Sequence, residues 1–415
     1  MKKLHRAWKV CIGCAILFFC TSGLVTNAFS IYLPYILSLD GFTNTRISTL
    51  LTVRSLAGFI ALFATGLYYR VLSLKKGMLL SMIMVAAGFL VYGFAGPSFP
   101  LYLLGALLTG FGYGFGSMAA IGVILDNWFE TDLPVATGIC GSVTGLSTLG
   151  IPTLITVLIG RVGLGNTFRL EALAILLITL LCRRLILSDP SGTGDVPFSR
   201  GQKSGEASAL SAVRPSYRPV LTKKLWLIMM PATFILGGYT ATAYSNLSVL
   251  MTGEGLSISA AALVILVSGL SVTASKLLYG FASERFSTYK CNWIFGALTV
   301  SGLILCQLTA GKAFPMGLSI VIYSAGLGMT TIGPVVWARE LSSHEDFEFN
   351  NRLFQIGFVG GTLLLSPFPG IIADRSGGSY LPAFLCFTVG AVLVTLIIQA
   401  VYRRAQDSAQ PRQRP

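Results

Sequence analysis

Apolar runs of about 20 residues recur along almost the entire chain, separated by short stretches that hold charges, proline, glycine or asparagine. A helix needs about 20 apolar residues to cross the ~30 Å hydrocarbon core of a bilayer. Inside that core every backbone N–H and C=O must be satisfied within the protein, which favours helices. The recurrence therefore predicts an all-α integral membrane protein with many spans.

The charge content agrees with a membrane protein and excludes a soluble globular one. Of the 415 residues, 53% are hydrophobic and only 11% are charged, whereas soluble domains carry about 25% charged residues. The net charge of +14 would suit a nucleic-acid-binding protein. The cations, however, lie between the apolar runs and at the two ends, so we expect a lipid bilayer and no nucleic acid as the neighbour.

Twelve candidate spans follow from the apolar runs and their boundaries. They form two sets of six, separated by a hydrophilic stretch rich in Ser, Gly, Pro and charge. The sequence thus predicts an N-terminal six-helix bundle (1–187), a cytoplasmic linker (188–222) and a C-terminal six-helix bundle with a short tail (223–415). The predicted spans are residues 10–37, 47–68, 77–95, 99–126, 135–160, 168–187, 225–250, 258–282, 291–310, 314–337, 353–372 and 380–402.

The distribution of Lys and Arg predicts the orientation. With twelve spans, both termini, the linker and the loops after even-numbered spans share one side, which carries 23 of the 30 Lys and Arg residues. Cations are retained on the cytoplasmic side of a membrane. We therefore expect both termini in the cytoplasm and the chain in the cell (inner or plasma) membrane. The basic start of the chain also resembles a signal peptide, but its apolar run is too long for one.

The eight cysteines fall in or at the edge of apolar stretches. We interpret them as reduced packing residues, and we expect neither a metal site nor a cofactor.

A loop motif after the eighth span connects the chain to a family. It contains Gly280, the adjacent pair Glu284 and Arg285, and the cation Lys290. This pattern resembles the cytoplasmic loop signature of the major facilitator superfamily, in which carboxylate and cations form a breakable contact between helices. The corresponding first-half loop keeps Gly66 and Arg70 but has no acidic residue. The alternative is that both loops simply carry the positive charge typical of cytoplasmic loops.

Three further stretches resemble bacterial members of the oxalate/formate antiporter and monocarboxylate transporter branch of that superfamily. They are Gly110-x-Gly112-x-Gly114-x-Gly116 with Asp126-Asn-Trp-Phe129, then Gly165-Asn-Thr-Phe-Arg169, and Gly370 to Tyr380. The resemblance implies the twelve-helix major facilitator fold and secondary transport. One departure is that Glu130 and Asp132 stand where the branch has an Arg.

Lys276, in the eighth span, is the first candidate for substrate binding. A cation at the membrane centre costs roughly 2.5 to 3.5 kcal/mol, so it needs a partner, water or a route to the surface. The resemblance implies a role for this position in holding a substrate carboxylate, with Lys in place of the usual Arg. The alternatives are a structural pair or snorkelling of Lys276 to the cytoplasmic end.

Arg54, in the second span, is the second candidate. The resemblance places its helix beside the central cavity, where Arg54 could attract or contact an anion. It could instead snorkel outward or pair with Asp40. If Arg54 and Lys276 face the same cavity, the site is electropositive.

Polar and aromatic residues near the expected midplane complete the predicted substrate site. They could hydrogen-bond substrate oxygens, or they could serve helix packing. Acidic residues, in contrast, fall near predicted helix ends, so we interpret Asp126, Glu171 and Glu340 as interfacial charges. The site residues in question are Asn27, Tyr32, Tyr113, Tyr239, Tyr244 and Tyr323.

The expected function is secondary transport of small organic anions, carboxylates above all, by proton symport or anion exchange. The alternative is a neutral solute or a drug on the same fold. An enzyme is not expected, because the two His residues do not sit in an acidic cluster within the membrane, and no Walker-type phosphate loop occurs. We expect a monomer that contacts lipid, its substrate and protons.

Overall fold

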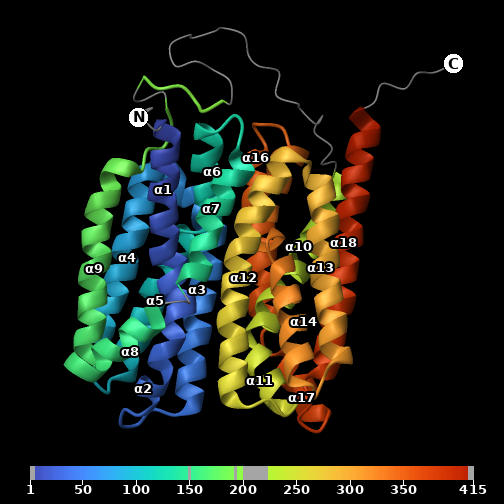
Figure 1. Cartoon of the computed structure of the whole chain (residues 1–415). Coiled ribbons are helices and arrows are strands. Elements are labelled where there is room, and N and C mark those ends of the chain that lie inside the picture. Colours follow the sequence, from blue (N-terminus) through green and yellow to red (C-terminus); the bar gives the residue numbers. More distant parts are fainter. Residues whose placement is uncertain (1–4, 148–150, 191–193, 200–222, 410–415) are drawn as a thin grey trace, which may run out of the picture. The chain divides into compact units, whose positions relative to one another are not determined.

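The computed structural model describes residues 5–147, 151–190, 194–199 and 223–409 (Figure 1). Every regular element within these ranges is a helix, and the β-type pairing found there is an isolated bridge between Phe129 and Phe198. Twelve of the helical stretches are long and apolar enough to cross a membrane. The all-α, twelve-span fold predicted from the sequence is therefore confirmed.

The chain forms two compact units. Unit 1 consists of Met1–Phe129 and Ile139–Phe198, and unit 2 of Glu130–Gly138 and Ser199–Pro415. Apart from the short segment Glu130–Gly138, unit 1 runs from blue to green in Figure 1 and unit 2 from green to red. The predicted bundle limits stay a prediction, because residues 191–193 and 200–222 of the linker lie outside the described residues.

Unit 1 begins with a first span in which four helical segments follow one another. Helix α4 packs against both α5 and α9, and α3 against α5. The elements are α1 (Arg6–Phe18), η1 (Phe19–Asn27), η2 (Ala28–Tyr32), α2 (Leu33–Leu37), α3 (Asn44–Val71), α4 (Leu74–Phe94), α5 (Phe99–Phe115), α6 (Met118–Trp128), α7 (Leu133–Leu146), α8 (Ile151–Val162) and α9 (Leu164–Leu185). The first six residues of α7 belong to unit 2.

Unit 2 contains the remaining helices. Helix α10 packs closely against α16, and α13 against both α14 and α18. The elements are α10 (Lys223–Ser245), α11 (Leu247–Gly253), α12 (Ile258–Arg285), α13 (Thr288–Leu308), α14 (Ala313–Gly326), α15 (Met329–Leu341), α16 (Phe347–Leu365), α17 (Phe368–Arg375) and α18 (Leu381–Ala409).

The first span changes its winding halfway. After α1, η1 is a π-helix and η2 a 3₁₀-helix, and the N–H of Ala28 donates to the carbonyl of Gly23, five residues back. Such π segments are rare and occur frequently at functional sites. The sequence predicts a single span over residues 10–37 and does not indicate the change of winding.

Glycines bring the helices of unit 1 into close contact. A Cβ at Gly112 on α5 would lie 2.7 Å from the carbonyl oxygen of Ser81 and 2.6 Å from a methyl carbon of Val85, both on α4. Both distances are too short for real atoms, so the α4–α5 contact requires glycine at this position. The glycine pattern of the fourth predicted span thus has a packing role. That span is also divided, since α5 ends at Phe115 and α6 begins at Met118.

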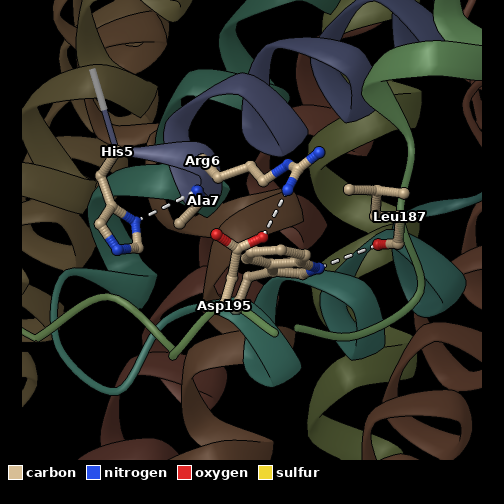
Figure 2. A network of polar contacts seen from close by, with 6 residues as sticks. His5, Arg6, Ala7, Leu187 and Asp195 are labelled. Atoms are coloured by element: carbon tan, nitrogen blue, oxygen red, sulfur yellow. Dashed lines mark hydrogen bonds and ion pairs between the residues drawn. The ribbon is translucent and has the colours of Figure 1, made fainter. Parts of the chain in front are cut away.

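The described residues after α9 fold back onto the end of unit 1 where α1 begins. The Arg6 guanidinium pairs with the Asp195 carboxylate at 2.7 Å, and the Trp128 indole N–H donates to the carbonyl of Leu187 at 2.9 Å (Figure 2). The ring of Phe198 contacts those of Trp8 and Phe129, with centroids 5.6 and 5.8 Å apart. We name residues 187–190 and 194–198 the strap.

Candidate functional site

Arg54 on α3 holds the first span at its change of winding. Its guanidinium donates to the carbonyl oxygen of Val25 in η1 at 2.6 Å, and its Cζ lies 4.9 Å above the ring of Phe29 in η2. The Arg54 side chain is half-buried. Within the described residues, Arg54 makes this contact with η1 and η2 and no ion pair with Asp40. The Arg54 guanidinium thus provides a hydrogen bond to a backbone oxygen of the π segment.

Tyr32 of η2 binds the same stretch to α9. Its hydroxyl donates to Oε2 of Glu171 at 2.5 Å, and its ring stacks on that of Phe168, with centroids 4.1 Å apart. Tyr32 is fully buried and Glu171 is half-buried. The stretch Val25–Tyr32 is therefore held by a cation from α3 and by an acid from α9.

Aromatic rings surround these contacts. The ring of Phe29 packs against those of Tyr32, Phe89, Tyr92 and Phe168, with centroids 5.3 to 6.4 Å apart. Tyr92 and Tyr113 lie within electrostatic range of Arg54. Of the predicted site residues, unit 1 therefore gathers Arg54, Tyr32 and Tyr113. Asn27 ends η1, but its side chain lies outside the described residues.

Glu171 occupies a different place from the one that the sequence indicated. The predicted span starts at residue 168, which puts Glu171 at a helix end. Helix α9 instead begins at Leu164, after Gly163 with φ of +82°. Glu171 therefore lies about two turns inside the helix. The residues from Leu164 to Phe168 look like a loop because they include Gly, Asn and Thr, yet the Thr167 hydroxyl bonds the carbonyl of Gly163 at 2.8 Å and fits the first turn.

Lys276 is buried in unit 2. It lies on α12, one turn before Gly280, and its side chain is only 5% exposed. The neighbouring Ser275 hydroxyl bonds the carbonyl of Ala325 on α14, and a Cβ at Gly138 on α7 would lie 3.0 Å from the Lys276 carbonyl oxygen. Close backbone packing on both sides therefore fixes this part of α12.

The three predicted site tyrosines of unit 2 lie together. The Tyr323 hydroxyl on α14 donates to the carbonyl of Thr240 on α10 at 3.1 Å, and Tyr239 and Tyr244 are within electrostatic range of Tyr323. Tyr239 is buried, and its hydroxyl has no hydrogen-bond partner among the described residues. The same holds for the buried hydroxyls of Thr242, Ser268 and Ser324. Unit 2 thus contains several buried donors in need of an acceptor.

Two residues of the predicted gating loop make close contacts within unit 2. Oε1 of Glu284 accepts the backbone N–H of Asp132 at 2.9 Å. Asp132 has φ of +64° and directly precedes α7, so a carboxylate sits at the positive end of a helix. A Cβ at Gly280 would lie 3.2 Å from Cα of Gly138. Glycine at 280 thus permits the approach of α12 to the start of α7.

The other predicted gating residues lie at more accessible positions among the described residues. Arg285, Lys290 and Arg70 are exposed, and Gly66 is half-buried. The backbone N–H of Lys290 is capped by the Ser287 hydroxyl at 3.4 Å. In the first-half loop, the hydroxyls of Tyr68 and Tyr69 donate to the carbonyls of Gly77 and Phe115, both at 2.8 Å. Tyrosines therefore anchor the loop that lacks the acidic residue.

A second buried carboxylate lies in unit 2. Glu340 on α15 accepts the hydroxyls of Thr288 and Tyr402, both at 2.6 Å. These bonds connect the start of α13, the end of α15 and α18. Among the described residues, no group of three or more His, Cys, Asp or Glu side chains could hold a metal ion.

Comparisons with known proteins give one family and one fold. The model of the family described as Major Facilitator Superfamily matches residues 14–342. The Escherichia coli fucose:proton symporter has 15% sequence identity and a TM-score of 0.71, over 98% of this chain and all of that chain. A bacterial homologue of the iron transporter ferroportin has 12% identity and a TM-score of 0.72, over 96% of this chain and all of that one. No curated protein sequence matches significantly. At such identities the two structures show a shared fold alone.

Proposed function

Because the chain belongs to the major facilitator superfamily, we propose that it is a secondary transporter that carries small organic anions, carboxylates above all, by alternating access. Such carriers bind substrate near the bilayer midplane between two helix bundles and expose it to each side in turn. Proton symport or anion exchange supplies the driving force. The protein acts as a monomer in the cell membrane, with both termini in the cytoplasm.

The observation that supports an anion is the burial of Lys276. Its side chain is 5% exposed within a membrane-spanning helix. A cation there is costly, and intramembrane charges of this kind generally mark a substrate or ion pathway. A carboxylate that reaches Lys276 gains a charge-assisted hydrogen bond, which is about twice as strong as a neutral one.

Arg54 and the tyrosines supply the remaining recognition in this proposal. Arg54 brings a second cation, in unit 1, and Tyr239 brings a buried hydroxyl that can donate to a carboxylate oxygen. The contacts of Gly280 and Glu284 with the start of α7 serve as the part that opens and closes during transport.

Uptake into proteoliposomes tests the proposal. Purified protein is reconstituted and supplied with labelled formate, lactate and oxalate, with and without a pH gradient. We expect uptake of at least one of them, and a loss of tenfold or more in Lys276→Ala. Lys276→Arg keeps the charge and should retain transport, and Lys312→Ala, at an exposed position of unit 2, serves as the matched control.

Thermal stability separates loss of binding from loss of folding. A carboxylate that binds the folded protein must raise its melting temperature. We expect this shift in wild type and not in Lys276→Ala. The anion assignment fails if none of the carboxylates shifts the melting temperature, or if Lys276→Ala transports them as wild type does.

A neutral, hydroxyl-rich solute is the second candidate. The unpartnered hydroxyls of Tyr239, Thr242, Ser268 and Ser324 favour it, because such groups can pair with sugar hydroxyls. One fold neighbour is named a fucose:proton symporter. Competition decides between the two candidates: under this second one, L-fucose or a related sugar blocks uptake and stabilises the protein, and carboxylates do neither.

A further inference from the structure

The contact between Glu171 and Tyr32 has no role in the anion site described above. Glu171 lies about two turns inside a membrane-spanning helix. Within the part of the chain that the structure describes, its hydrogen-bond partner is the Tyr32 hydroxyl, and no Lys or Arg lies within ion-pair distance. A carboxyl group that is held in a membrane without a cation suits a group that gains and loses a proton.

Few other ionisable groups share its surroundings. Helix α8 has Arg161, which is exposed, and α1 has the exposed Arg6 and Lys9 near its start. On α9 itself, Arg169 is turned away, because its Nε donates to the carbonyl of Gly93 at 3.0 Å. Nearby lie the phenols of Tyr32 and Tyr92, the thiol of Cys20, and Arg54 beyond Phe29, while Lys75 and Lys76 lie at the opposite end of α4 from Tyr92.

We propose that Glu171 is a proton-binding site of unit 1, and that its protonation is coupled to anion binding at Arg54 through the segment Val25–Tyr32. This inference rests on the proposed anion transport, and it assigns the driving ion to one residue. A chain of contacts joins the two groups: Arg54 lies over Phe29 at 4.9 Å, the rings of Phe29 and Tyr32 are 5.8 Å apart, and Tyr32 bonds Glu171.

Both ligands loosen the same segment. A carboxylate accepts a stronger hydrogen bond from Tyr32 than a neutral carboxyl group does, so a proton on Glu171 weakens the contact between η2 and α9. An anion at Arg54 competes with the carbonyl of Val25 for the guanidinium, which weakens the contact between η1 and α3. Because each ligand removes one of two constraints on one segment, each favours the binding of the other. That coupling is the property of a symporter.

Infrared difference spectroscopy tests the proton site without any substrate. The purified protein is titrated with alkali, and the carbonyl band of protonated carboxyl groups is followed. We expect one component of this band to disappear on titration in wild type and to be absent from Glu171→Gln. Glu340→Gln, which alters the other buried hydrogen-bonded carboxylate, should retain the Glu171 component. A band that is unchanged in Glu171→Gln overturns the proposal.

Transport tests the coupling. In proteoliposomes, Glu171→Gln should lose accumulation of carboxylate driven by an inward proton gradient, at least tenfold, and keep exchange of internal for external carboxylate. Glu340→Gln should keep both. If Glu171→Gln still accumulates carboxylate in response to the gradient, the coupling role is wrong. If wild type neither transports nor binds carboxylates, the proposed substrate is wrong, and the infrared result still decides whether Glu171 binds a proton.

The variant Tyr32→Phe tests whether the Tyr32 hydroxyl is hydrogen-bonded to Glu171 in the membrane. It removes the hydrogen bond and keeps the stacked ring. We expect the Glu171 component of the infrared band to shift in frequency, because the carboxyl group loses its hydrogen bond with Tyr32. An unchanged band would mean that the two residues are not in contact in the membrane.

Discussion

Arg54 donates to the carbonyl oxygen of Val25 at 2.6 Å, from one helix of unit 1 to the π segment of another. A π-helix disturbs the regular pairing of backbone groups, and a buried carbonyl without a donor is costly. Arg54 supplies a donor to the carbonyl of Val25 and also covers the ring of Phe29. Arg54 therefore has a structural role, and a substrate anion that binds Arg54 would have to compete with the carbonyl of Val25.

Arg54→Met should lower the melting temperature of the purified protein. It removes the charge-assisted hydrogen bond to the carbonyl of Val25, at a cost of about 1.5–3 kcal/mol. Arg46→Met is the matched control, since Arg46 also donates to a carbonyl oxygen at 2.6 Å, that of Gly41, but is exposed. We expect a much smaller shift for the control. Equal shifts would show that the Val25 contact adds no stability.

Gly112→Ala should destabilise unit 1, because the added methyl group would overlap the α4 backbone at Ser81. Overpacking of this kind typically costs about 1–3 kcal/mol. Gly160→Ala provides the comparison, since a Cβ at that helical position meets nothing within 4 Å. That variant should be neutral or slightly stabilising, as alanine is the better helix former. Thermal unfolding in detergent measures both, and a stable Gly112→Ala would contradict the close α4–α5 contact.

Mild oxidation should join Cys11 and Cys140. Their sulfur atoms are 4.0 Å apart, from α1 and α7, and both residues are buried in unit 1. A disulfide needs a sulfur distance of about 2.05 Å, so a small side-chain movement is enough. After treatment with diamide and denaturation, maleimide labelling should fall by two thiols in wild type and by none in Cys11→Ser. Unchanged labelling of wild type would place the two sulfurs farther apart.

Phe198→Ala should release the strap from unit 1. The change removes the ring contacts with Trp8 and Phe129. Limited proteolysis in detergent should then cut between residues 194 and 199 several times faster. Val196→Ala is the control, because the Val196 side chain is 54% exposed and adds little packing. Equal cleavage rates in both variants would show that the aromatic contacts do not hold the strap.

The spans were predictable because the bilayer imposes a length and a polarity on each of them. Twelve apolar runs correspond to twelve candidate membrane spans among the described residues, and the glycine pattern on α5 indicated a packed face that the contact with Ser81 bears out. The altered winding of η1 was not predictable, since a change from α to π winding has no fixed residue pattern. Glu171 was misplaced for a similar reason. The first turn of α9 contains Gly and Asn, so the sequence predicts a start at residue 168 and a terminal Glu171, whereas α9 begins at Leu164.

The sequence indicates single candidate residues of the site, but it does not indicate which residues contact each other. Cations in apolar runs are conspicuous, so Arg54 and Lys276 stood out. The contacts of Arg54 and Lys276 depend on tertiary packing, which cannot be read from the spacing of residues along the sequence. The hydroxyl of Tyr32 bonds Glu171, a contact that the sequence does not indicate, and the substrate role of Tyr32 stays a prediction. The contact of Glu284 with the N–H of Asp132 needs the positive φ of Asp132, which a non-glycine residue rarely adopts.

The π segment gives the first span a means of motion that needs no hinge. A π turn holds one more residue than an α turn, and this surplus residue can be passed to the next turn by exchanging one backbone hydrogen bond for another. Such an exchange shifts only the residues between the old and the new position of the wide turn, each by one residue, which is about 100° around the helix axis. If the wide turn moved from η1 past Tyr32, it would turn the Tyr32 side chain away from Glu171 while α1 stays in place, so a change of register within the first span would break the contact of η2 with α9.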